Sequence, residues 1–116
     1  MTILEKSRDL SIMELYKLTQ DPKTETLKEH IGEVIKVTGY VLREEDDGKR
    51  VLSLELADGD PIASNSPTVQ KSFAGILALF ASVGQTPYPM NLAIYTAQST
   101  KNKDRNFVDI RLVEAE

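Results

Sequence analysis

Residues 34–57 read VIKVTGYVLREEDDGKRVLSLELA, and they carry the clearest secondary-structure pattern of the chain. Both ends of the stretch alternate apolar with polar residues, and an Asp-Gly pair at 47–48 lies in the turn between them, which is typical of a β-hairpin. Gly39 interrupts the first half and predicts a bulge or a sharp bend of the kind that small barrels use at their corners. We therefore expect a long curved strand, a tight turn and a second strand over 50–57.

The sequence after the hairpin predicts a short strand, a helix and two final strands. Asp58-Gly59 predicts another tight turn, and 61–64 is long enough only for a short strand. Ser66-Pro67 is typical of a helix start, an apolar stripe at helical spacing follows, and Gly84 predicts the helix end. Two further alternating segments predict the last two strands.

The first 30 residues are expected to be helical. Ser11 and Glu14 have the spacing of a capping box, and apolar residues at helical spacing predict a helix over 11–20. Asp21-Pro22 ends this helix, because the residue before a proline is disfavoured in the helical conformation. A second short helix is expected over 24–30.

The expected order is a helix, three antiparallel strands, a helix and two strands. This is the order of the OB-fold, a five-stranded, partly open barrel that binds oligonucleotides and oligosaccharides. We predict a mainly β barrel in one domain over 1–116, with a helical extension over 1–31, the barrel over 32–113 and a flexible basic loop over 99–106. A small α+β sandwich with the same number of strands is the alternative.

Composition indicates a soluble globular protein. The chain has 116 residues, 41% hydrophobic and 28% charged, and holds no apolar run near the roughly 20 residues that cross a bilayer. Its first residues are charged and lack a signal-peptide pattern, so a cytoplasmic protein is expected. The chain has no cysteine and one histidine, His30, which we interpret as structural; disulfides, thiolate nucleophiles and Cys-based zinc sites are excluded.

The sequence contains no motif for an enzyme or a cofactor. It lacks the phosphate-loop, metalloprotease and nucleophile-elbow signatures, and no second histidine could form an acid–base pair. Four acids at 44–47 could hold a hard cation, but they lack the EF-hand spacing and are interpreted as a solvated turn. We expect a protein that is not an enzyme and uses neither cofactor nor metal.

Charge is unevenly distributed along the chain. Residues 1–60 contain 9 Lys/Arg and 14 Asp/Glu, a net charge of −5, whereas residues 61–111 contain 5 and 2, a net charge of +3. An anionic ligand responds to the local field, and salt screens exposed charges beyond about 10 Å. The total charge of −4 therefore does not exclude a nucleic-acid partner.

Strand positions that alternate with the expected core carry aromatic and basic side chains. The residues expected to fill the barrel are Ile35, Val37, Leu52, Leu54, Leu56, Leu92, Ile94, Val108, Ile110 and Leu112. The opposite positions place Tyr40, Tyr95 and Phe107 outward, where each ring can stack on a base for about 1–3 kcal/mol. The cations expected to contact phosphate are Lys36, Arg43, Lys49, Arg50, Lys101, Lys103, Arg105 and Arg111. The pattern predicts an interface for single-stranded nucleic acid.

Several alternatives to this interface are left open. The N-terminal helices could cover one or more of the rings, and the bend at Gly39 could exchange the face that Tyr40 occupies. Glu55 and Asp109 share the outward positions and weaken a phosphate groove. The basic loop is either a solvated hairpin or an arm that closes over a bound strand.

Several segments of the chain resemble small single-stranded-DNA-binding proteins of phages that infect Gram-positive bacteria. The segments are MELYKLT at 13–19, Gly32, VTGY at 37–40, Asp58-Gly59, ASNSPT at 63–68 and STK at 99–101, so the resemblance spans most of 13–113. It implies an OB-fold that coats single-stranded DNA during phage replication or recombination, in the host cytoplasm, without reading sequence and without chemistry. It also implies Tyr40, Tyr95, Phe107 and the loop around Lys101 as the DNA-facing set.

A protein-interaction module is the rival hypothesis. Such a module would dock on a host or recombination factor through the N-terminal helices and an acidic face, and the net charge of −5 over 1–60 favours it. The two hypotheses differ in whether the outward rings are free or covered by those helices. An exposed sheet edge would also allow a homodimer.

Overall fold

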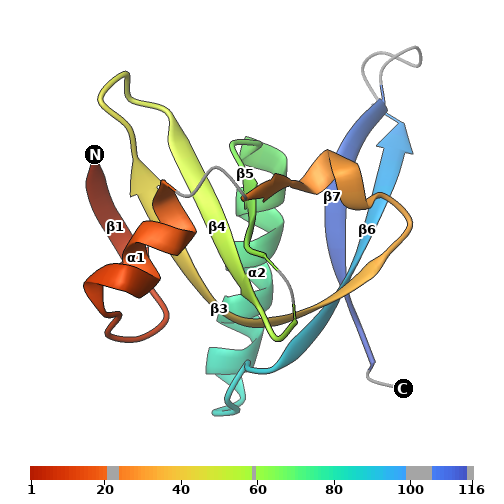
Figure 1. Ribbon diagram of the computed structural model, residues 1–116. Helices are drawn as coiled ribbons and strands as arrows, with labels where there is room; N and C mark the ends of the chain where they lie inside the picture. Colours follow the sequence, from red (N-terminus) through yellow and green to blue (C-terminus); the bar gives the residue numbers. More distant parts are fainter. Residues whose placement is uncertain (21–23, 59, 99–105, 115–116) are drawn as a thin grey trace.

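The computed structural model describes residues 1–20, 24–58, 60–98 and 106–114. A curled, half-barrel sheet makes up most of this part of the chain, and helices pack against it (Figure 1). The strands are β1 (Thr2–Lys6), β2 (Glu25–Thr26), β3 (Val34–Glu44), β4 (Arg50–Leu56), β5 (Ile62–Ser64), β6 (Met90–Gln98) and β7 (Asn106–Val113). The helices are α1 (Ile12–Thr19), the 3-10 helix η1 (Leu27–His30) and α2 (Pro67–Ser82). The prediction of a mainly β fold is confirmed, and the half-barrel sheet is compatible with a barrel-like fold.

The strands follow the order β2-β5-β4-β3-β6-β7, and β1 pairs with the second half of β3. The β2–β5 pair is parallel, and the remaining pairs are antiparallel. The first half of β3 pairs with β6, and its second half pairs with β1 and β4, so this long strand joins the two halves of the sheet. Among the described strands β5 and β7 do not pair with each other, which leaves a seam between them.

A bulge in β3 exchanges the two faces of the sheet. The pairing register with β4 shifts between Val37 and Gly39, so one extra residue lies on β3 at this point. A Cβ at Gly39 would lie 2.8 Å from Ser7 Oγ, so the close approach of the chain favours glycine. Before the bulge Val37 faces the core, and after it Tyr40 packs against the core. Val41, which shares the alternation of Val37 in the sequence, is therefore buried on the opposite face of the sheet.

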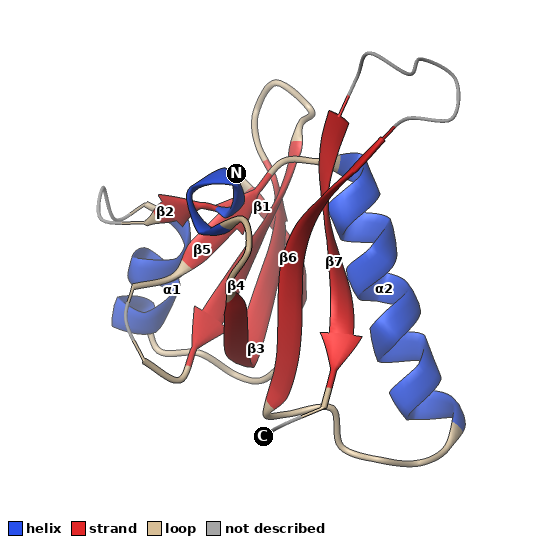
Figure 2. Cartoon of the chain, turned by 90° about the vertical axis from the view of Figure 1, so that its right-hand side faces the viewer, coloured by secondary structure: helices blue, strands red, loops and turns tan. Residues whose placement is uncertain are grey.

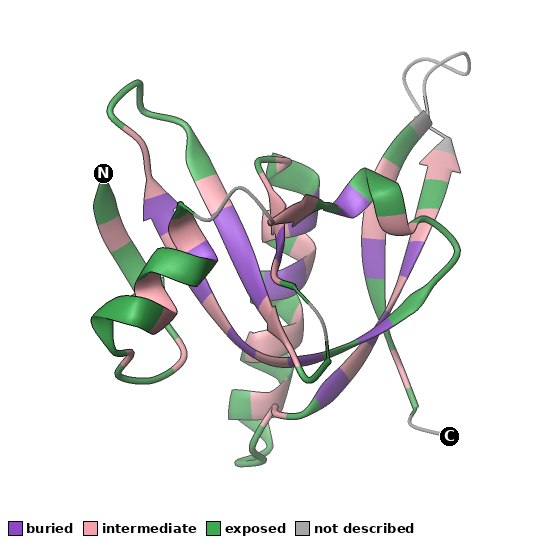
Figure 3. Cartoon of the chain, in the orientation of Figure 1, coloured by how far each residue is buried: buried purple, intermediate pink, exposed green. Residues whose placement is uncertain are grey.

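The core lies between the concave side of the sheet and α2. Buried side chains include Leu52, Leu54, Ile62, Val69, Phe73, Leu92, Ile94 and Ile110. Figure 3 shows buried stretches on the long strands and on one part of α2. The start of α2 is fixed as expected, because the Ser66 side chain accepts a hydrogen bond from the Val69 amide and Pro67 is the first helical residue. Leu112, predicted to be inside, is 38% exposed because it lies near the open end of β7.

The helix α1 covers the opposite, convex side of β3 and β4. Leu18 is buried there at 3% exposure, together with Val41 and Ser53. Ser11 caps the helix through the capping box predicted from its spacing. Arg8 connects α1 to the sheet, because its Nη2 donates to Glu14 of α1 at 2.6 Å and to Glu55 of β4 at 2.9 Å.

The prediction that the first 30 residues are helical is wrong for two segments. Residues 2–6 form β1, which pairs with β3 where β6 has left it, and 25–26 form β2. The free backbone groups of β3 and β5 supply hydrogen bonds that local helix propensity does not. The second expected helix is reduced to the four residues of η1. No helix among the described residues is long and apolar enough to cross a membrane.

Candidate nucleic-acid interface

Four of the predicted side chains lie on one face of the sheet. Residues paired across antiparallel strands point to the same side, and the pairs here are Tyr95 with Asp109, Ala93 with Arg111, and Ala97 with Phe107. Lys36 of β3 joins this face through its pairing with Asn91. We call Lys36, Tyr95, Phe107 and Arg111 the β6–β7 face. Figure 2 shows β6 and β7 in the foreground, with α2 beside β7 rather than over the face.

The rings of the β6–β7 face are accessible and accompanied by cations. Phe107 is 37% exposed, Tyr95 is half-buried, and both Lys36 and Arg111 are exposed. The Arg111 guanidinium lies 5.8 Å from the centre of the Tyr95 ring, a cation–π contact of about 0.5–1 kcal/mol at an exposed site. A stacked base contributes about 1–3 kcal/mol, so a base can displace Arg111 from the ring and leave the guanidinium for a phosphate.

One carboxylate lies among these side chains and is already engaged. Asp109 Oδ1 accepts hydrogen bonds from Ser72 Oγ of α2 at 2.7 Å and from the Ile110 amide at 2.8 Å. The Tyr95 hydroxyl donates to Asp109 Oδ2 at 3.4 Å. These donors hold the carboxylate toward α2 and offset part of its charge. Asp109 therefore orients the Tyr95 ring more than it opposes a phosphate.

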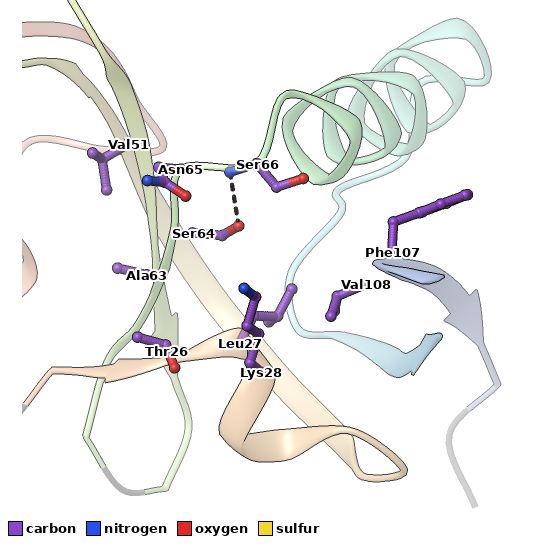
Figure 4. Close-up of a pocket in the computed structure, with 10 residues that line it drawn as sticks. All are labelled: Thr26, Leu27, Lys28, Val51, Ala63, Ser64, Asn65, Ser66, Phe107 and Val108. Atoms are coloured by element: carbon purple, nitrogen blue, oxygen red, sulfur yellow. Dashed lines mark hydrogen bonds between the residues drawn. The ribbon is translucent and has the colours of Figure 1, made fainter. Parts of the chain in front are cut away.

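A groove with a volume of about 570 Å³ runs along the seam between β5 and β7 (Figure 4). The residues that line it are Thr26, Leu27, Lys28, Val51, Ala63, Ser64, Asn65, Ser66, Phe107 and Val108. None of these ten carries a carboxylate, although the chain holds 18 Asp and Glu, and Lys28 adds a positive charge. Hydroxyl and amide groups on an apolar floor suit a nucleotide, which presents a ring, a sugar and an anion.

The groove and the β6–β7 face meet at β7. In Figure 4 the Phe107 ring points away from the other labelled residues, whereas the next side chain, Val108, points toward Leu27. Successive side chains of a strand point to opposite faces, so Phe107 lies on the β6–β7 face and Val108 lies on the side of the groove. Sequence reasoning missed the groove, because it forms only when β2 and η1 occupy the seam. The polar run Ser64-Asn65-Ser66 was the available signal.

Two of the predicted contact residues are placed elsewhere. Tyr40 was expected outward, but its ring packs edge-to-face on Phe73 of α2 with the ring centres 5.1 Å apart. Burial accordingly raises the pKa of the Tyr40 hydroxyl above its ordinary value. The extra residue of the β3 bulge is the cause, since it reverses the parity of every later side chain.

Arg43, expected to contact phosphate, is buried beneath α1 at 8% exposure. Its Nη1 donates to Ser53 Oγ at 2.8 Å and to the Leu18 carbonyl at 3.3 Å, and its Nε donates to Glu45 at 2.5 Å. The same parity change turns this side chain to the convex side, where α1 covers it. In this arrangement Arg43 joins α1 to the sheet and is not available to a phosphate.

The remaining predicted cations lie apart from the β6–β7 face or outside the described residues. Lys49 and Arg50 are exposed at the start of β4, next to the groove residue Val51. In the preceding turn, Asp46 binds the terminal amine of Met1 at 2.7 Å. Lys101, Lys103 and Arg105, with most of the predicted loop over 99–106, lie outside the described residues.

Comparisons with known proteins found no matching family model, no matching curated protein and no matching solved structure.

Proposed function

We propose that the protein is a sequence-nonspecific single-stranded-DNA-binding protein built on an OB-fold. The observation that carries the proposal is the gathering of Tyr95, Phe107, Lys36 and Arg111 on one accessible face, beside a groove whose described lining residues carry no carboxylate. Its role would be to coat single-stranded DNA in phage replication or recombination, as the resemblance implies. No catalytic step is part of the proposal.

The strand pairing supports an OB-fold. The order β5-β4-β3-β6-β7, with α2 between β5 and β6 in the chain, suits a five-stranded barrel that is open at one seam. The segments β1, α1, β2 and η1 are then additions before the barrel. OB-folds bind oligonucleotides on the face of their second and third strands, which correspond here to β4 and β5. Because α1 covers part of β4, we place the DNA on the uncovered side, through the groove and over β7.

The proposed mechanism combines stacking with phosphate contacts. Bases stack on Tyr95 and Phe107, and Lys36 and Arg111 neutralise the adjacent phosphates. The strand then crosses β7 into the groove, where Lys28 and the hydroxyl groups of Ser64 and Ser66 contact the next phosphate or sugar. Rings and cations accept any base, so the proposed binding does not depend on sequence.

Fluorescence anisotropy tests the proposal. Untagged protein is titrated into labelled oligo-dT of about 30 nucleotides, long enough for two OB-fold sites, at low and at moderate salt. We expect saturable binding that weakens as salt rises, and an equal excess of duplex should not displace the oligo-dT. No binding at low salt, or displacement by duplex at equal concentration, would contradict the proposal.

A second candidate function, protein interaction, is favoured by one surface of α1. Ile12 is 80% exposed, Met13 61% and Tyr16 45%, so one side of this helix offers apolar groups to solvent. A double variant, Ile12→Ser with Met13→Ser, should keep its affinity for oligo-dT and lose cross-linking to a replication or recombination factor. Equal cross-linking by the variant would argue against this function.

A further inference from the structure

Three potential metal ligands lie together where β2 meets η1. A carboxylate oxygen of Glu25, one of Glu29 and a ring nitrogen of His30 all lie within 4.8 Å of one another. Glu25 belongs to β2, and the other two are consecutive residues of η1. The Thr26 amide donates to Glu29 Oε2 at 3.4 Å, which orients that side chain and leaves its second oxygen for another partner.

The two nitrogens of His30 both face carboxylates. Nε2 contacts Glu25 Oε2, and Nδ1 lies 3.1 Å from Glu33 Oε2. Nδ1 is shielded from solvent and has no aligned hydrogen-bond partner. A neutral imidazole carries one N–H, so with the proton on Nδ1 the lone pair of Nε2 points at carboxylate oxygens. Either a second proton, which lets the imidazolium donate to both carboxylates, or a metal ion bound to Nε2 and the carboxylates removes this repulsion.

The positions match the usual surroundings of a histidine ligand. A histidine that binds a metal donates its other ring N–H to a carboxylate, which fixes the tautomer and the ring, and Glu33 is placed to accept that bond. Among the described residues, no lysine or arginine forms an ion pair with Glu25, Glu29 or Glu33. A divalent ion would balance the charge of two carboxylates.

We propose that Glu25, Glu29 and His30 bind a divalent transition-metal ion such as Zn²⁺, with Glu33 as the positioning residue for His30. One imidazole with two carboxylates suits Zn²⁺ and its neighbours, whereas Mg²⁺ and Ca²⁺ prefer oxygen ligands alone. Water would complete the coordination.

The site lies behind the wall of the groove. Thr26, Leu27 and Lys28 line the groove, and all three lie in the sequence between the ligands Glu25 and Glu29. A metal ion would therefore close a short loop around these residues and fix the groove wall. The metal site does not depend on the proposed function; only its effect on DNA binding does.

The single histidine of the chain makes the test specific. Untagged, full-length protein is freed of metal with a chelator, and the imidazole proton signals of His30 are followed by NMR during addition of Zn²⁺. We expect these signals to change in a saturable way with an end point at one equivalent, and Mg²⁺ at the same concentration should leave them unchanged.

Substitutions distinguish the proposed metal ligands from acidic residues that do not bind the ion. Glu29→Gln and Glu25→Gln should each weaken Zn²⁺ binding more than tenfold, and Glu33→Gln should weaken it about 10–100-fold by releasing the ring. Asp47→Asn, in the exposed β3–β4 turn, keeps a favourable Asn-Gly pair and should bind as the wild type does. Thermal unfolding of the metal-free variants should match the metal-free wild type, which shows that the loss concerns the ion.

Two results would overturn the metal site: His30 signals that respond to pH but not to Zn²⁺, or equal Zn²⁺ affinity in Glu25→Gln, Glu29→Gln and the wild type. The two proposals fail independently. A protein that binds Zn²⁺ at His30 but not oligo-dT keeps the metal site and loses the proposed function.

Discussion

Two faces of the same sheet each carry an arginine that the sequence predicts as a phosphate contact. Arg111 on the β6–β7 face is exposed and lies over the Tyr95 ring. Arg43 on the β3–β4 face is 8% exposed and is bonded to α1 through the Leu18 carbonyl. Neither arginine belongs to the core between the sheet and α2, but only one remains available to a ligand.

The difference lies in what covers each face. The capping box and the Arg8 contacts hold α1 against β4, whereas α2 lies beside β7 and engages the edge through Ser72 and Asp109. An outward position on a strand is therefore a site only if no other element packs over it.

Removing both rings of the β6–β7 face should have the largest effect. Tyr95→Ala with Phe107→Ala should weaken binding of oligo-dT by about 2–6 kcal/mol, because each stacked base contributes about 1–3 kcal/mol and the losses add if the sites are independent. The measurement is anisotropy at one salt concentration. Tyr40→Phe is the matched control, since its ring faces Phe73, and it should bind as the wild type does. Unchanged affinity in a folded double variant would remove this face from the proposal.

Truncating the covered arginine should affect stability. Arg43→Ala should lower the free energy of unfolding by about 2–4 kcal/mol, because the hydrogen bonds of a charged group to Ser53, Leu18 and Glu45 are lost and Ser53 and Leu18 stay buried. Arg111→Ala should change stability by less than about 1 kcal/mol, because this exposed residue loses only its cation–π contact with Tyr95. Urea unfolding compares the two. Equal midpoints would show that the faces do not differ.

Removing the exposed cations should alter the salt dependence of binding. Each of Lys36→Ala and Arg111→Ala should reduce the slope of log affinity against log salt by about 0.7, the value for one phosphate contact on a single strand. Anisotropy at several salt concentrations gives the slope. Lys17→Ala, on α1, should leave it unchanged. A similar reduction in all three variants would indicate a general charge effect instead of a defined path.

How far the sequence could predict this structure depended on whether the signal was local. The Asp-Gly hairpin, the Ser11 capping box and the Ser66-Pro67 helix start depend on neighbouring residues, and the structure has them. The strand β1 depends on residues far away in the sequence. It forms because β6 pairs only with the first half of β3 and leaves the backbone groups of the second half free on that side. Its five residues carry no pattern that reports this.

The candidate site divides along the same line. On β6 and β7 no register shift is found, so alternation correctly placed Tyr95, Phe107 and Arg111 on one face. On β3 the bulge at Val37–Gly39 reversed the alternation, and Tyr40 and Arg43 took the opposite sides. Gly39 signalled the bend, but no local pattern reports how many residues the bulge inserts, which only the pairing register with β4 shows. The groove forms only where β2 lies in the seam between β5 and β7, and no local sequence pattern predicts its shape.

Low pH should weaken the contact between Arg8 and Glu14 that holds α1 on the sheet, and this is the smallest of the expected effects. The Arg8 guanidinium, with the Ser11 amide, lowers the pKa of Glu14 from 4.5 to about 2. A lowered folded-state pKa stabilises the protein above pH 4.5, and the contribution is lost as pH falls from there toward 2. Glu14→Gln should flatten that part of a stability-against-pH curve measured by urea unfolding, whereas Asp47→Asn should not. Parallel curves for the wild type and Glu14→Gln would contradict the role of this contact.

The contrast between the faces is tested most directly by an NMR titration of ¹⁵N-labelled protein with oligo-dT of about 10 nucleotides, within the site size of one OB-fold. We predict that the amide signals of β6, β7 and residues 26–28 shift in a saturable way, and that those of α1 stay in place. Shifts centred on α1 and β4, with β6 and β7 unchanged, would contradict the account.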